Sequence, residues 1–248
     1  MLVAAAVCPC PPLLVPEVAA GAAPELDAAR AACADALGVL AAARPDLLVV
    51  VGPAGETGTF PEGTPGSFRG FGVDVAVRLG ASATSATSAP GALGAARAEP
   101  QGVLPPSLAV AAWLLERTGW SDAPIEGLGI AEPTTAERCI QTGRELAAQA
   151  GRVALLVMGD ASACRTLKAP GYLDERAAPF DASVARALGS ADVPALQELD
   201  IALARELQAS GRAPWQVLAG AAEAADLAGA LLYEDAPYGV GYLVATWS

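Results

Sequence analysis

Histidine is absent from the 248 residues of this chain. Imidazole is the usual proton-transfer group near neutral pH and a frequent metal ligand, so its absence excludes a serine-histidine-aspartate triad and any histidine-bound metal. Lysine is almost absent too, because Lys168 stands against fourteen arginines. Hydrophobic residues make up 53% of the chain, yet no uninterrupted apolar run reaches the roughly 18 to 20 residues of a membrane span. We therefore expect no membrane-embedded segment.

The chain also lacks any concentration of positive charge. Its formal net charge is -12, and no cluster of lysine and arginine offers the surface that nucleic acid phosphates require. The first residues, MLVAAAV, lack the basic region of a secretory signal. Five cysteines, an odd number without paired zinc spacing, indicate reduced thiols. These features predict a cytoplasmic protein that binds neither nucleic acid nor membranes.

Apolar runs and amphipathic segments alternate along the chain, which is typical of an α/β fold. The runs at 47–51 and 153–158 are continuously apolar, as in strands buried on both faces of a parallel sheet. Strands are predicted at 1–7, 47–51, 73–77, 125–130, 153–158, 229–233 and 240–246. Helices are predicted at 18–43, 106–118, 134–150, 179–188, 194–208 and 214–226. We predict a single α/β domain over residues 1–248, with a central, mostly parallel sheet and helices on both faces.

Two further local features are predicted. Residues 54–72 and 80–98 are rich in glycine, proline and small polar side chains, which favours long surface loops. Thr134-Thr135-Ala136-Glu137 matches a capping box, in which Thr134 and Glu137 satisfy the free amides at the start of a helix.

Ligands of open α/β sheets bind beyond the carboxyl ends of the strands, where loops converge and helix amino termini point their free amides. Residues 8–12, 52–60 and 159–165 follow three predicted strands, and the turn at 234–239 can join them. The residues expected to line a cleft there are Cys10, Pro53, Glu56, Phe60, Asp160, Cys164, Tyr172, Glu234 and Tyr238.

The side chains of this set suggest a ligand class. Its aromatic residues suit a flat apolar molecule, and the local positive cluster of Arg165, Lys168 and Arg176 suits an anion. Core packing of the aromatic residues and solvation of the loop charges are the alternative interpretations. We expect a small aromatic or anionic ligand.

Asp160, Ser162 and Lys168 are the candidates for catalysis. Ser162 and Lys168 could form a serine-lysine hydrolytic pair. Alternatively, Asp160 or Ser162 caps the next segment. Cys164 lies beside Arg165, which could lower its pKa and make it a nucleophile.

A metal site without histidine needs other donors. Cys10 with Glu56, Asp160 or Glu234 could form a zinc-like site. The alternative is that Cys10 is a small buried side chain. We expect no metal and no other cofactor.

Six segments follow one another in an informative order along nearly the whole chain. They are CPCPPLLVPE, PDLLVVVGPAG, SFRGFGVD, MGDAS, LKAPGYLDERAAPFD and APYGVGYLVA. In this order they resemble the class III extradiol dioxygenase catalytic subunits of the LigB type and the related Memo-like proteins. The resemblance implies a LigB-like α/β fold. It also implies an enzyme that opens catechol-type rings with dioxygen at a ferrous ion held by two histidines and a third, usually carboxylate, ligand.

The chain departs from this family where the family's histidines stand. The resemblance places the first metal histidine at Cys10, the second within Ala54–Thr57 and an acid-base histidine at Ala163. Ferrous iron that activates oxygen prefers imidazole and carboxylate ligands with open positions, and catechol deprotonation needs a base. The resemblance therefore implies a degenerate member of the superfamily, a pseudoenzyme without ring-cleaving iron chemistry.

Three functional hypotheses follow. The first is a LigB-like ligand-binding or interaction protein. The second is a divergent enzyme, either a dioxygenase or a hydrolase, which uses a thiolate and carboxylate metal site or the Ser162/Lys168 pair. The third is that the chain works within an assembly, with a homodimer as the expected form.

Overall fold

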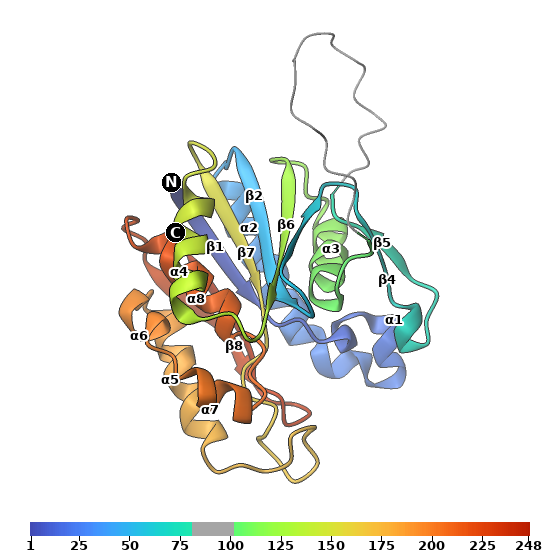
Figure 1. Ribbon diagram of the computed structural model, residues 1–248. Coiled ribbons are helices and arrows are strands. Elements are labelled where there is room, and N and C mark those ends of the chain that lie inside the picture. The colour runs from blue at the N-terminus through green and yellow to red at the C-terminus, as the bar shows by residue number, and fades with distance from the viewer. Residues whose placement is uncertain (81–101) are drawn as a thin grey trace.

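Seven strands form the main sheet of the computed structural model, which describes residues 1–80 and 102–248. They are β1 (Leu2–Cys8), β2 (Leu47–Ala54), β3 (Gly58–Pro61), β6 (Ile125–Ala131), β7 (Val153–Met158), β8 (Gly229–Asp235) and β9 (Tyr242–Trp247). Their order is β3-β6-β2-β7-β1-β9-β8 (Figure 1). Strands β6, β2, β7 and β1 are parallel, β8 runs the same way, and β3 and β9 are reversed. The predicted α/β class with a mostly parallel central sheet is confirmed.

The central strands are buried on both faces because they are apolar at every position. In β2, Val49 and Val51 belong to one core cluster, whereas Leu48 and Val50 belong to the other. Strand β7 is divided in the same way, and all six of its residues are buried. Successive side chains of a strand point to opposite faces, so each of these strands contributes to two hydrophobic layers.

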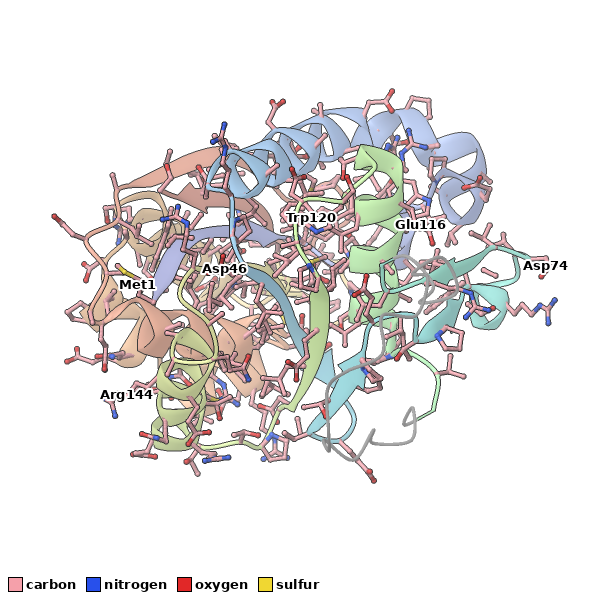
Figure 2. The ribbon with its side chains drawn as sticks, turned by 90° about the horizontal axis from the view of Figure 1, so that it is seen from above. Met1, Asp46, Asp74, Glu116, Trp120 and Arg144 are labelled. Carbon is pink, nitrogen blue, oxygen red and sulfur yellow. The ribbon has the colours of Figure 1, made fainter. Side chains whose placement is uncertain are left out.

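Helices cover both faces of the sheet. One face carries η1 (Pro12–Leu14), α2 (Asp27–Ala42) and α3 (Pro106–Thr118). The other carries α4 (Ala136–Ala147), α5 (Ala177–Gly189), α6 (Val193–Gln197), α7 (Ile201–Glu206) and α8 (Arg212–Ala222). Figure 2 shows the strands between α3, which carries Glu116, and α4, which carries Arg144. None of the helices in the described ranges is long and apolar enough to cross a membrane.

The remaining elements are short. They are α1 (Pro16–Ala19), η2 (Ala20–Leu26), η3 (Arg69–Phe71) and a separate two-stranded sheet of β4 (Pro65–Ser67) and β5 (Ala76–Arg78). The helix predicted at 18–43 is wrong in its first part, because α2 begins only at Asp27. The chain takes a positive φ of 49° at Ala20, and Pro24 lacks the N–H that a continuous α-helix needs.

Three other predictions require correction. Residues 54–72 are not a plain loop, because β3 adds to β6 with Phe60 opposite Gly127, and the Phe60 ring packs where a side chain on Gly129 would lie. The cap of α4 is Thr135, whose Oγ1 accepts from the Arg138 N–H, and not Thr134. The helix predicted at 194–208 is two helices, because Asp200 caps the start of α7. The loop predicted at 80–98 lies, beyond Gly80, outside the described residues.

Both edges of the main sheet are irregular. Strand β3 is four residues long and ends in Pro61, which has no N–H to offer a further strand. On the opposite edge, the pairing of β8 with β9 shifts register between Leu231 and Tyr233, which leaves Leu232 as an extra residue. Leu231 and Leu232 are exposed.

Helices α4 and α8 cross at two glycines. A methyl group on Gly143 would overlap the carbonyl oxygen of Val217, and one on Gly220 would overlap that of Ile140. Only glycine permits such close approach of two backbones. Helix α8, which is buried along its whole length, is therefore held against α4 by backbone contact.

We expect Gly143→Ala to lower the free energy of unfolding by about 2 kcal/mol or more, because the added methyl must push the helices apart. The matched control is Gly38→Ala in α2, where an added Cβ meets nothing within 4 Å. That variant should be stabilised by about 0.5 to 1 kcal/mol through helix propensity. Urea unfolding followed by circular dichroism measures both. A Gly143→Ala variant as stable as the parent would contradict the close backbone contact of α4 and α8 at this glycine.

Candidate functional site

Loops converge at the carboxyl edge of the parallel strands, as the sequence predicts. The segment after β1 lies beside the segment after β7, since the Gly159 N–H donates to the Cys8 carbonyl oxygen at 3.0 Å. Beyond it, Ala161 and Ser162 pair with Gly241, and the Arg165 N–H donates to the Gly239 carbonyl oxygen at 3.0 Å. The chain after β7 is thus joined to the chain before β9.

Asp160 connects three segments of this edge. Its Oδ1 accepts a hydrogen bond from the Cys10 N–H at 2.8 Å, and the Cys10 Sγ lies 3.9 Å from Oδ2. Its own N–H donates to the Ser210 Oγ at 3.0 Å, and its carbonyl oxygen accepts from the Gly211 N–H at 2.9 Å. Asp160 does not cap a helix but ties the loop after β1 to the connection between α7 and α8.

Burial controls the protonation of Asp160 and of its neighbours Cys10 and Tyr242. Burial raises the pKa of Asp160 to about 7, although the hydrogen bonds from Cys10 favour the charged form. Burial and the neighbouring Asp160 raise the pKa of the Cys10 thiol well above its usual value. Burial and Asp160 also raise the pKa of Tyr242. At neutral pH, Cys10 is therefore a neutral thiol and Asp160 is close to half-protonated.

The raised pKa of Asp160 predicts a pH-dependent stability. The folded protein holds a proton that the unfolded chain releases at the ordinary carboxyl pKa of 3.8, so the stabilisation is full below that value and is lost as the pH rises through about 7. Since each pKa unit corresponds to about 1.4 kcal/mol, the free energy of unfolding should fall by a few kcal/mol between pH 5 and pH 8. Histidine, whose titration normally dominates the change of stability between pH 5 and pH 8, is absent.

The Asp160→Asn variant removes the titrating group and should flatten this fall. Denaturant unfolding at a series of pH values measures both proteins. Parallel curves for the parent and the variant would contradict the assignment to Asp160.

A second polar cluster is centred on Asp181 of α5, which is 1% exposed. Its Oδ1 accepts from the Ser162 N–H at 2.8 Å, and its Oδ2 accepts from the Ser162 hydroxyl and from Nη1 of Arg165, both at 2.9 Å. A Cβ atom on Gly241 would lie 2.5 Å from Oδ2. The cluster holds the loop after β7 close to the turn before β9. Sequence reasoning missed Asp181, although it ends the quoted segment LKAPGYLDERAAPFD.

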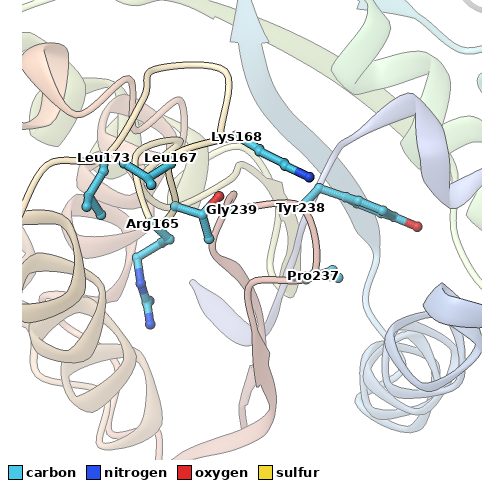
Figure 3. Close-up of a pocket in the computed structure, with 8 residues that line it drawn as sticks. Arg165, Leu167, Lys168, Leu173, Pro237, Tyr238 and Gly239 are labelled. Carbon is cyan, nitrogen blue, oxygen red and sulfur yellow. The ribbon is translucent and has the colours of Figure 1, made fainter.

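A cleft of about 650 Å³ opens between the loop after β7 and the turn between β8 and β9 (Figure 3). It is lined by Arg165, Thr166, Leu167, Lys168, Leu173, Pro237, Tyr238 and Gly239. In Figure 3 the Lys168 side chain extends toward Tyr238, whereas Arg165 points to the other side of the loop. The Tyr238 hydroxyl donates to Oε2 of Glu25 at 3.0 Å, which fixes this wall to η2.

Two predicted site residues, Lys168 and Tyr238, lie in this cleft, and Asp160 begins the loop that forms its wall. Cys164 is buried, with its thiol donating to the Leu207 carbonyl oxygen at 3.5 Å. Burial, followed by the charge of Asp174, raises the pKa of Cys164. This direction is opposite to the lowered pKa that a nucleophilic thiol beside Arg165 would need.

The other predicted cleft residues lie elsewhere. Pro53, on β2, accepts a hydrogen bond from Ser107, and Glu56 lies in the exposed turn before β3. Phe60 packs on β6, Tyr172 is 62% exposed, and Glu234 lines a neighbouring pocket of about 390 Å³ together with Arg165.

The proposed catalytic and metal combinations are not assembled. Ser162 is completely buried and its hydroxyl is bonded to Asp181, whereas Lys168 is exposed. Within residues 1–80 and 102–248, no three acidic or thiol side chains lie close enough together to hold a metal ion. Cys10 contacts Asp160, but within that part of the chain it belongs to no such group with Glu56 or Glu234.

Comparison with known proteins gives the fold but no family. The structure is similar to the crystal structure of the uncharacterized protein JW3007 from Escherichia coli K12, with a TM-score of 0.54 and 16% sequence identity over 99% of this chain and 100% of that one. No protein-family model and no curated protein matches the sequence. At this identity the likeness shows a shared fold alone.

The two polar side chains suggested as a hydrolytic pair should differ in their effect on stability. Ser162→Ala removes one of the bonds to a buried carboxylate, so the free energy of unfolding should fall by about 1 to 3 kcal/mol. Lys168→Ala, at an exposed position, should change it by less than about 0.5 kcal/mol. Chemical denaturation measures both, and an unchanged Ser162→Ala protein would argue against a structural role for this hydroxyl.

Proposed function

We propose that this chain is a LigB-like member of the extradiol dioxygenase superfamily that binds a small molecule and has lost the ring-cleaving iron chemistry. The order of the six sequence segments supports the family, and the α/β fold agrees with it. The observation that carries the binding role is the cleft formed by Lys168, Leu173, Tyr238 and their neighbours at the carboxyl edge of the sheet.

The residues at the expected iron position do not fit ferrous iron. Cys10, where the resemblance expects the first histidine, is a protonated thiol beside Asp160. Glu56, the acidic residue of the second position, is exposed in a turn. Ala163, at the acid-base position, offers only backbone groups: its N–H donates to the Leu207 carbonyl oxygen and its carbonyl oxygen accepts from the Gly171 N–H, both at 2.9 Å. Such a set lacks the imidazoles and the converging carboxylate that an oxygen-activating ferrous site needs.

The cleft has the character of a binding site for a small molecule. Its walls combine apolar side chains with a few polar groups that can orient a ligand, as ligand pockets generally do. Hydrogen bonds at Gly239 and Gly241 and the buried Asp181 hold these walls in place. The alternative of a divergent enzyme gains less support, because Ser162 is bonded to Asp181 and Cys10 has no metal-binding partners among the described residues.

The proposal also includes the cellular location and the partners of the protein. We place the protein in the cytoplasm, because its five cysteines are free thiols, as is usual in a reducing compartment. Its strong negative charge argues against binding to nucleic acid. A homodimer stays the expected assembly.

Iron analysis combined with a ring-opening assay tests the loss of the ancestral reaction. The purified protein, supplied with ferrous ion under anaerobic conditions, should retain substoichiometric iron after desalting. On addition of oxygen and a catechol such as protocatechuate, it should consume oxygen no faster than free ferrous ion. Stoichiometric iron with multiple turnovers to a ring-opened product would refute the proposal.

A further inference from the structure

We infer that the groove between α4 and the strands β3 and β6 is a second binding site, and that it takes an organic monocation, an amine with an apolar body. The groove shares no lining residue with the cleft at the carboxyl edge of the sheet. Binding there is therefore independent of the cleft and of the function proposed for it.

The groove has an apolar floor and polar walls. Leu128 and Ile130 of β6, together with Leu146 of α4, form the floor, and the walls are mainly hydroxyl, amide and charged side chains of β3 and α4. Its volume of about 480 Å³ lies within the usual range for small-molecule sites of about 300 to 1,000 Å³. Such a lining suits a small molecule that combines a hydrocarbon body with a polar group.

The direction of α4 brings two negative groups to one end of the groove. This helix connects β6 to β7, which point the same way, so it runs back against β6. Its last turn therefore lies at the end where β6 begins, and both Glu126 of β6 and Gln149 after the helix line the groove. The carbonyl groups that end a helix carry partial negative charge. The Glu126 carboxylate thus lies near a group of like charge, an arrangement that a cation would relieve.

Glu126 is also the unbalanced charge of the lining. The other two charged residues of the groove, Arg138 and Glu145, form an ion pair with each other at 3.5 Å. Glu126 forms no ion pair with any residue in the described ranges 1–80 and 102–248. Its side chain is half-buried, where solvent and salt screen a charge less than on the open surface.

The charges of α4 and of the turn before it do not reverse this balance. Arg144 is paired with Glu223, and Glu132 is paired with the buried Arg212 at 3.7 Å. Glu137 is exposed and adds one more negative charge on the helix. No arginine of α4 is therefore left over to neutralise Glu126.

The arginines at the end of the sheet where β6 begins belong to its other face. Arg152 precedes β7, two strands from β6, and its guanidinium donates to the carbonyl oxygens of Ala43 and Arg44. Those two residues follow α2, which covers the face opposite to α4. A ligand ammonium group beside Glu126, with its hydrocarbon chain on Leu128 and the rest of the floor, supplies the positive charge that the groove lacks.

Two probes with the same alkyl chain separate the ionic contribution from the apolar one. Hexylammonium carries one positive charge, and 1-hexanol has a hydroxyl in its place. Titration of the full chain, followed by amide chemical shifts in nuclear magnetic resonance spectra, should show hexylammonium binding about five to ten times more tightly than hexanol, as expected for a charge-assisted contact. The shifts should map to β3, β6 and α4. Added salt should weaken the binding of hexylammonium alone.

Substitutions assign this preference to Glu126. Glu126→Gln should weaken hexylammonium about fivefold to tenfold and leave hexanol unchanged. Glu137→Gln, which removes an equal charge from an exposed position of α4 outside the lining, is the matched control and should change neither affinity. Thr59→Trp, at an exposed position of β3 that lines the groove, should fill it and weaken both probes. Leu173→Asp, in the separate cleft, should weaken neither.

Three results would overturn the inference. The first is equal affinity for the two probes. The second is a Glu126→Gln protein that binds hexylammonium as tightly as the parent, or that loses no more affinity than Glu137→Gln does, since the cation would then follow the overall negative charge. The third is a set of shifts that lies outside β3, β6 and α4. None of these results bears on the cleft, whose function is tested by the iron and ring-opening measurements.

Discussion

A buried carboxylate is tolerated only when its oxygen atoms accept enough hydrogen bonds to replace water, and Asp181 meets this requirement through residues of one loop. The backbone and hydroxyl of Ser162 and the guanidinium of Arg165 all converge on it. Moving that loop away would leave a charge uncompensated in the interior. The same carboxylate leaves no room for a side chain at Gly241. The geometry of the cleft therefore depends on a contact that lies beneath it.

Cys10, where the resemblance expects a metal-binding histidine, lies at a structural junction. Cys10 donates a hydrogen bond to the Asp160 carboxylate. The backbone N–H and carbonyl oxygen of Asp160 are in turn hydrogen-bonded to Ser210 and Gly211. A side chain on Gly159 would overlap Gly211, so the loops are packed backbone to backbone. Hydrogen bonds that fix loops in this way stabilise the edge of the sheet rather than leave ligand positions open. The cleft lies further along the same loop.

The sequence was sufficient for the parts of the fold in which local pattern and final environment agree. The apolar runs of β2 and β7 and the helix α3, from Pro106 to Thr118, lie where periodicity places them. Convergence of the loops after β1 and β7 followed from the general geometry of parallel sheets. Lys168 and Tyr238, which the sequence analysis chose for their charge and their aromatic ring, both line the cleft at that edge.

Other features depend on contacts between distant residues and leave little local signal. Asp181 lies within the amphipathic helix α5, where an acidic residue normally faces solvent, and its partner Ser162 is 19 positions away. Tyr238 and Glu25 are 213 positions apart. The exposure of Leu167 and Leu173 could not be predicted either, because an apolar residue in a loop is usually taken as part of the core. The sequence did not predict the 3-10 segment η2, because alanine-rich sequence matches a helical pattern even where Pro24 interrupts it.

The irregular strands at the two ends of the sheet have a consequence for how the protein behaves in a crowded solution. Proline at the end of β3 and the extra residue Leu232 in β8 interrupt the rows of backbone groups that another chain would need for a continuous ladder. These interruptions disfavour growth of the sheet from molecule to molecule at both ends. The exposed leucines of β8 thus lie on an edge strand whose extra residue disfavours amyloid-like stacking.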